Sequence, residues 1–63
     1  MINDEEFSLL IEKLESKHRD CIAFSKKYET RKMEELKQYY EGAKWALEFS
    51  IAQLKELNNK SSP

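Results

Sequence analysis

Three side chains in the first half of the chain have the types and spacing that could support chemistry: Glu15, His18 and Cys21. They lie three residues apart, so a helix would place them on one face. A carboxylate, a histidine and a thiol placed together can produce a reactive thiolate for nucleophilic catalysis. One helix face supplies neither an oxyanion site nor a pocket, however, and the chain has no second histidine or cysteine. We therefore expect a protein that is not an enzyme and has no catalytic residues.

The same residues set the expectation for metals and cofactors. His18 and Cys21 could share a metal ion, but a structural zinc site takes about four ligands. A single cysteine excludes an intramolecular disulfide, and the sequence has no glycine-rich loop of the kind that cradles phosphates. We expect no metal, no cofactor and no small-molecule substrate. We interpret Cys21 as a small buried apolar residue and His18 as a residue at the edge of the core.

The scarcity of glycine and proline indicates which type of secondary structure positions these side chains. The 63-residue chain has one glycine, Gly42, and one proline, Pro63, and 37% of its residues are charged. Glycine and proline are the residues that usually interrupt helices. The sequence therefore predicts one all-α domain over residues 1–63. It has no stretch of about 20 apolar residues that would span a membrane. Its acidic first residues differ from the basic start of a signal peptide, so we expect a cytoplasmic protein.

Local signals place the predicted elements along the chain. Asn3 can cap a helix, Glu6 can complete a capping box, and Ile2 and Phe7 have the spacing of a hydrophobic staple. Apolar residues then recur at helical spacing in both halves of the chain, and Thr30 can cap the second helix. The predicted order is a helix over about 4–28, a turn over about 29–32, a helix over about 33–58 and a frayed tail over 59–63.

A shift in the apolar register predicts that the chain turns back on itself. Apolar residues lie seven apart from Phe7 to Tyr28, and again seven apart from Met33 to Leu54, but the register slips by five residues between the two runs. An antiparallel helical hairpin explains this slip. The alternative is one unbroken helix, about 80 Å long, in an oligomeric coiled coil. The hairpin is favoured because it buries half of the apolar surface within one chain.

The second predicted helix has two apolar faces. Tyr40, Ala43 and Leu47 share one side, whereas Trp45 and Phe49 lie about 160° away from Leu47 on a helical wheel. A helix that contacts only its hairpin partner needs one apolar stripe, so the second face predicts another contact. The residues expected in that contact are Tyr39, Gly42, Trp45, Ala46, Phe49 and Ala52. Two hairpins that cover this surface would form a dimeric four-helix bundle, so we expect a homodimer. The alternative is that Trp45 and Phe49 remain exposed as anchors for a different protein, and the sequence leaves open which apolar face makes the self-contact.

A basic segment follows in the middle of the chain. Residues 13–32 carry seven bases against three acids, although the net charge is −1. Lys26, Lys27, Arg31 and Lys32 would surround the turn and could contact an anion or nucleic acid. A solvated turn explains the same charges, and acidic residues spread over the polar faces argue against a membrane-surface role. The overall charge does not favour nucleic acid as the partner.

The segment Tyr39–Phe49 has the sequence YYEGAKWALEF. It resembles a pattern of small helical accessory proteins from phages and prophages of Gram-positive bacteria, in which an aromatic-Glu-Gly step leads into a helix of Ala, Leu and aromatic residues. The resemblance covers only the C-terminal half. It implies an accessory protein that works in the host cytoplasm by binding and inhibiting a host enzyme or defence complex.

These observations lead to one principal hypothesis and two alternatives. The principal hypothesis is a small protein-binding module, an inhibitor or antagonist of a host protein, that acts through a helix face. The first alternative is a nucleic-acid-associated regulator that uses the basic segment 26–32. The second is a structural helical subunit of a larger assembly.

Overall fold

The first helix, α1 (Asp4–Thr30), begins where the sequence supplies a cap. The side-chain Oδ1 of Asn3 accepts a hydrogen bond from the backbone N–H of Glu6 at 2.8 Å, which satisfies one of the free donors at a helix start. The acids of the first turn stabilise the positive end of the helix dipole. The predicted cap at Asn3 is confirmed. Of the predicted staple, Phe7 is half-buried and Ile2 lies outside the described residues.

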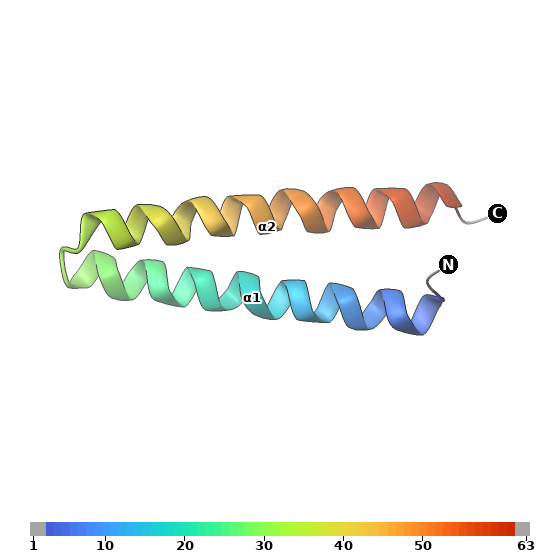
Figure 1. The fold of residues 1–63 in the computed structure, drawn as a ribbon, viewed down its shortest axis with the longest axis horizontal. Coiled ribbons are helices and arrows are strands. Elements are labelled where there is room, and N and C mark those ends of the chain that lie inside the picture. Colours follow the sequence, from blue (N-terminus) through green and yellow to red (C-terminus); the bar gives the residue numbers. More distant parts are fainter. Residues whose placement is uncertain (1–2, 62–63) are drawn as a thin grey trace.

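The computed structural model describes residues 3–61 of the chain, with side chains through residue 59. It is an antiparallel hairpin of α1 and α2 (Glu34–Ser61), measuring 49 × 17 × 14 Å. Figure 1 shows the two helices side by side along their whole length, with the start of α1 and the end of α2 at the same end. The predicted all-α hairpin is confirmed, and the chain does not adopt the alternative of one long helix.

The turn between the helices is a Schellman motif. The N–H of Met33 donates to the carbonyl of Tyr28 at 2.9 Å, and the N–H of Lys32 donates to the carbonyl of Glu29 at 3.1 Å. Lys32 has a φ of 58°, the left-handed conformation that such a motif requires and that glycine usually supplies. These bonds satisfy carbonyls at the end of α1 and reverse the chain within residues 31–33.

The observed ends of the helices differ slightly from the predicted ones. Thr30 belongs to the last turn of α1, where its hydroxyl donates to the carbonyl of Lys26 at 3.0 Å, so it does not cap α2 as predicted. The second helix begins at Glu34 and extends to Ser61, so residues 59–61 are helical rather than a frayed tail. Asparagine lowers helix propensity only moderately, and no glycine or proline occurs between Gly42 and Pro63 to stop α2 earlier.

The helices meet along a seam in which residues alternate three and four apart, the spacing of a coiled coil. The seam consists of Phe7, Ile11, Leu14, His18, Cys21, Ser25 and Tyr28 on α1, and of Lys37, Tyr40, Lys44, Leu47, Ile51, Leu54 and Asn58 on α2. Its buried residues are Ile11, Cys21 and Ser25, and none of the described side chains is completely buried. Five seam positions carry polar or charged side chains, so the apolar core within one chain is thin.

Aromatic rings cluster at the turn end of the hairpin. The rings of Phe24, Tyr28 and Tyr40 stack on one another, with centroids 5.1 to 6.3 Å apart. The Tyr39 ring meets that of Tyr40 edge-on at 5.0 Å. Aromatic pairs of this kind add about 0.5–1.5 kcal/mol beyond the area they bury. This cluster ties the turn end of α1 to the start of α2.

Candidate protein-binding surface

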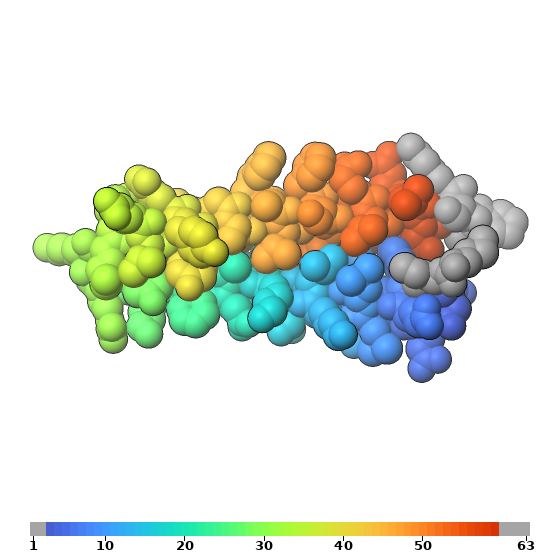
Figure 2. All heavy atoms as spheres, in the orientation of Figure 1, coloured from blue at the N-terminus to red at the C-terminus, as the bar shows by residue number. Residues whose placement is uncertain are grey.

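The outer face of α2 carries large aromatic side chains that the hairpin does not cover. We define this outer face by the six residues predicted to form an interface: Tyr39, Gly42, Trp45, Ala46, Phe49 and Ala52. All six are exposed, with exposed fractions of 67% for Tyr39, 66% for Trp45 and 56% for Phe49. The Trp45 and Phe49 rings stack at 5.9 Å with an interplanar angle of 16°. In Figure 2, side chains from the middle of α2 stand out from the edge of the molecule opposite α1.

The side of α2 that faces α1 includes polar residues, although large apolar residues of the same helix face solvent. Lys44 lies half-buried in the seam, and the carboxylates of Glu41 and Glu48 bond to side chains of α1. Trp45 and Phe49, in contrast, face solvent. Burying apolar area is worth about 25 cal/mol per Å², so exposing these two aromatic side chains forgoes a stabilising contribution. An arrangement of this kind is typical of a helix whose outer face is covered by a further contact.

Gly42 lies inside α2 rather than at its end, because the helix continues without interruption to Ser61. A Cβ atom added at Gly42 would meet no other atom within 4 Å. The hairpin therefore does not need a glycine at this position, although glycine costs about 1 kcal/mol relative to alanine in a helix interior. Gly42 and Ala46, four residues apart, leave a low strip beside the stacked rings of Trp45 and Phe49.

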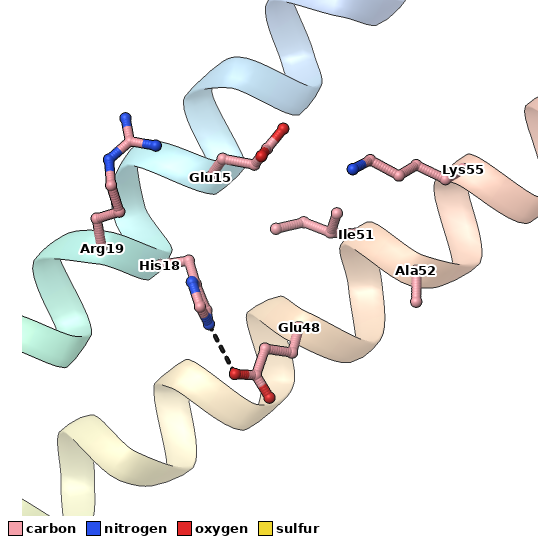
Figure 3. Close-up of a pocket in the computed structure, with 7 residues that line it drawn as sticks. All are labelled: Glu15, His18, Arg19, Glu48, Ile51, Ala52 and Lys55. Atoms are coloured by element: carbon pink, nitrogen blue, oxygen red, sulfur yellow. Dashed lines mark hydrogen bonds and ion pairs between the residues drawn. The ribbon is translucent and has the colours of Figure 1, made fainter.

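A shallow groove of about 410 Å³ lies on one flank of the seam. Figure 3 shows its lining: Glu15, His18 and Arg19 from α1, and Glu48, Ile51, Ala52 and Lys55 from α2. The imidazole Nε2 of His18 lies 2.8 Å from the Glu48 Oε1, a contact that joins the helices across 30 residues of sequence. The carboxylate of Glu15 and the amine of Lys55 point toward one another from opposite helices. Both signs of charge line this groove.

The three side chains of the possible thiolate arrangement are not brought together. Cys21 is buried in the seam, His18 bonds to Glu48 of the other helix, and Glu15 is directed toward Lys55. His18, which we expected at the edge of the core, is half-buried and also lines the groove. Among the described residues, no group of three His, Cys, Asp or Glu side chains could hold a metal ion.

Two polar contacts across the seam were missed by the sequence analysis. Ser25 is buried, and its hydroxyl lies 3.5 Å from the Glu41 carboxylate, while His18 bonds to Glu48. The alternating three- and four-residue spacing does include His18 and Ser25, and in a hairpin that spacing indicates which polar residues face the other helix. The spacing therefore predicts that both residues face α2, but a pattern that includes only apolar residues does not contain them.

The basic segment surrounds the turn, as predicted. Lys26, Lys27, Arg31 and Lys32 are all exposed at that end of the hairpin. The Lys27 ammonium lies 5.9 Å from the Phe24 ring centroid and 5.8 Å from that of Tyr28, within the range of a cation–π contact. Lys32 occupies the left-handed position of the Schellman motif. Of these four bases, Lys27 therefore has a structural explanation at the turn.

No protein-family model, curated protein or solved structure matches this chain. Neither of the described helices is long and apolar enough to cross a membrane. The geometry of the outer face is accordingly the basis for the functional assignment.

Proposed function

We propose that this chain is a small helical binding module that acts in the cytoplasm as an inhibitor or antagonist of another protein. The observation that carries the proposal is the exposed Trp45–Phe49 stack on the outer face of α2. Tryptophan and tyrosine are enriched among the residues that dominate the energy of protein interfaces. Binding by itself alters a partner's activity when it covers or displaces a functional surface.

The shape of the outer face fits a helix or groove of the partner. Trp45 and Phe49 are one helical turn apart and act as neighbouring anchors, and Tyr39 extends the surface toward the turn. Gly42 and Ala46 add little bulk between these rings, so a partner backbone can approach α2 closely. An amphipathic helix that binds through anchors at such spacing is a common mode of recognition. The resemblance of the Tyr39–Phe49 segment to phage accessory proteins favours a host protein or defence complex as the target.

The test begins with the whole chain as bait in an extract of the source cells, alongside the double variant W45A/F49A. A protein retained by the wild type is then purified, and its affinity is measured by calorimetry. Truncating aromatic anchors costs about 2 kcal/mol or more each, so we expect the double variant to bind at least about 100-fold more weakly. Trp45 is the only tryptophan, so its fluorescence emission should also shift to shorter wavelength on binding.

Leu9 supplies the matched control. It is a large exposed apolar residue on α1, away from the outer face, with an exposed fraction of 51%. We expect L9A to bind the same purified target with unchanged affinity. Equal binding of the target by the wild type and by W45A/F49A would refute the proposal.

A further inference from the structure

The two flanks of the hairpin differ sharply in polarity. One flank, which contains the groove of Figure 3, carries Ser8, Glu15, Ile22 and Glu29 on α1 and Glu34, Glu41, Glu48 and Lys55 on α2. The other flank, which we call the lateral face, carries Leu10, Lys17 and Phe24 on α1 and Leu36, Ala43 and Ser50 on α2. In each row the residues lie seven apart, so each row follows the seam along the helix. The flank with the groove is rich in charged residues, which favour solvent. The lateral face has one charged side chain, Lys17, among these six.

The lateral face is incompletely covered within one chain. The exposed fractions of Phe24 and Leu36 are 39% and 38%, while Leu10 and Ala43 are half-buried. This surface spans both helices and is distinct from the outer face, with which it shares no residue. A hairpin that buries its seam and leaves a second apolar row on each helix has the pattern of half a four-helix bundle.

The exposed area is large for a chain of this size. The hairpin exposes 5285 Å² in total. A folded monomer of 7.5 kDa typically exposes about 4,250 Å², so the surplus is about 1,000 Å². A stable protein–protein interface of standard size buries about 800 Å² on each partner. The surplus of one hairpin is thus sufficient for one such interface.

We propose that a second copy of this chain covers the lateral face and forms a four-helix bundle. The face is complementary to itself, as a two-fold interface requires. On α1 it is a row of large side chains, with Phe24 and the aliphatic stem of Lys17, and on α2 it is a low strip at Ala43 and Ser50. A two-fold axis parallel to the helices places α1 of each copy against α2 of the other. Large residues then meet small ones, and Lys17 reaches solvent at the edge.

This arrangement leaves the outer face of α2 exposed on both copies, whereas the sequence-based expectation placed the dimer contact on that face. Trp45 and Phe49 lie away from the lateral face, so the bundle presents two such surfaces. Dimerisation and the proposed function therefore use different residues and can fail separately.

The decisive measurement is the solution mass of the whole chain across a dilution series, by sedimentation equilibrium. We expect a dimer that dissociates on dilution, with helical content by circular dichroism falling as it does. Ser50 is exposed in the hairpin, so S50E adds a charge to the lateral face without disturbing the fold of one chain. The variant is made in a K17Q background, because the proposed pairing brings Lys17 of the second copy near Ser50, where it would pair with the new carboxylate. An unpaired carboxylate is costly to bury, and we expect a dissociation constant at least about 100-fold higher than that of K17Q.

Ala52 is the matched control, because it lies two residues after Ser50 on α2 and is also exposed. A52E, in the same K17Q background, adds the same charge on the outer face, and we expect its dimer dissociation constant to stay within about threefold of that of K17Q. A wild-type chain that remains monomeric throughout the series overturns the proposal, whatever the variants do. Equal effects of S50E and A52E overturn the assignment to the lateral face.

The pairing of α1 with α2 of the second copy has its own test. It places both turns at the same end of the bundle, whereas the opposite orientation separates them by about the 49 Å length of the hairpin. Chains carrying K32C, with the native Cys21 buried, should be joined by a short bismaleimide into covalent dimers. A K32C protein that sediments as a dimer but resists this cross-link overturns the proposed pairing.

Discussion

At the scale of single residues, Gly42 is a position where the hairpin itself has no structural need for glycine. Its surroundings are open within the chain, and its backbone is helical. A glycine at such a position is destabilising in the chain alone, because it loses more conformational freedom on folding than alanine does. Its presence is consistent with the close approach of a partner to the outer face.

We expect G42A to raise the free energy of unfolding of the chain alone by about 1 kcal/mol. The physical reason is the higher helix propensity of alanine, with no clash to offset it. Urea denaturation followed by circular dichroism measures the change. The reverse substitution A46G, at the next exposed turn, should lower the free energy of unfolding by a similar amount. A loss of stability in G42A would show that the glycine is required by the fold.

His18 and Glu48 illustrate the limits of a polar contact at this scale. Their contact joins α1 to α2, but the Glu48 side chain is about half exposed. Exposed pairs of this kind contribute about 0–1 kcal/mol. The pair therefore helps to align the two helices more than it stabilises them, and the stability of the hairpin depends mainly on its apolar seam.

At the scale of elements, the turn between α1 and α2 holds a non-glycine residue in an unfavourable backbone conformation. The Schellman motif needs a left-handed residue, and the chain places Lys32 there. The left-handed conformation costs a residue with a Cβ atom about 1–2 kcal/mol. Arg31 and Met33 complete the reversal around it.

We expect K32G to raise the free energy of unfolding by about 0.5–1 kcal/mol, since glycine adopts the left-handed conformation without steric cost. The gain is smaller than the full steric cost because glycine also increases the entropy of the unfolded chain. Thermal or urea denaturation measures it. The neighbouring K26G, inside α1, is the control and should destabilise by about 1 kcal/mol. Equal destabilisation by both variants would contradict the role of the left-handed turn.

At the scale of the whole molecule, the hairpin has a small apolar core. Chains of this size bury a limited fraction of their surface, and a single core of about 60 residues is marginally stable. Ile11 is the most completely buried large side chain among the described residues, with an exposed fraction of 7%. The stability of the hairpin within one chain therefore depends on few residues.

We expect I11A to lower the free energy of unfolding by about 2–4 kcal/mol, because it removes buried apolar atoms and leaves a cavity. A loss of that size is a large part of the stability of a small domain, so helical content should fall at room temperature. Circular dichroism during urea titration measures the effect. L9A is the surface control and should change stability by less than about 0.5 kcal/mol. A fully helical I11A with an unchanged midpoint would contradict the importance of this seam position.

Local signals in the sequence were sufficient for much of the fold. The Asn3 cap, the uninterrupted helical spacing and the register slip after Tyr28 predicted two helices joined by a turn. The same spacing separated Trp45 and Phe49 from the apolar side of α2 that meets α1. These features depend on residues within one or two helical turns of each other, which is the range over which helix propensity and side-chain spacing act.

The tertiary structure alone decided which residue of α2 each polar seam residue of α1 contacts and which flank of the hairpin is apolar. The His18–Glu48 contact and the burial of Ser25 depend on aligning residues 16 to 30 positions apart. That alignment follows from the antiparallel packing of the helices and from the three-residue turn at 31–33. The sequence determined the helices and their outward aromatic residues, and the packing of α1 on α2 determined the lateral face, because a flank exists only once two helices lie side by side.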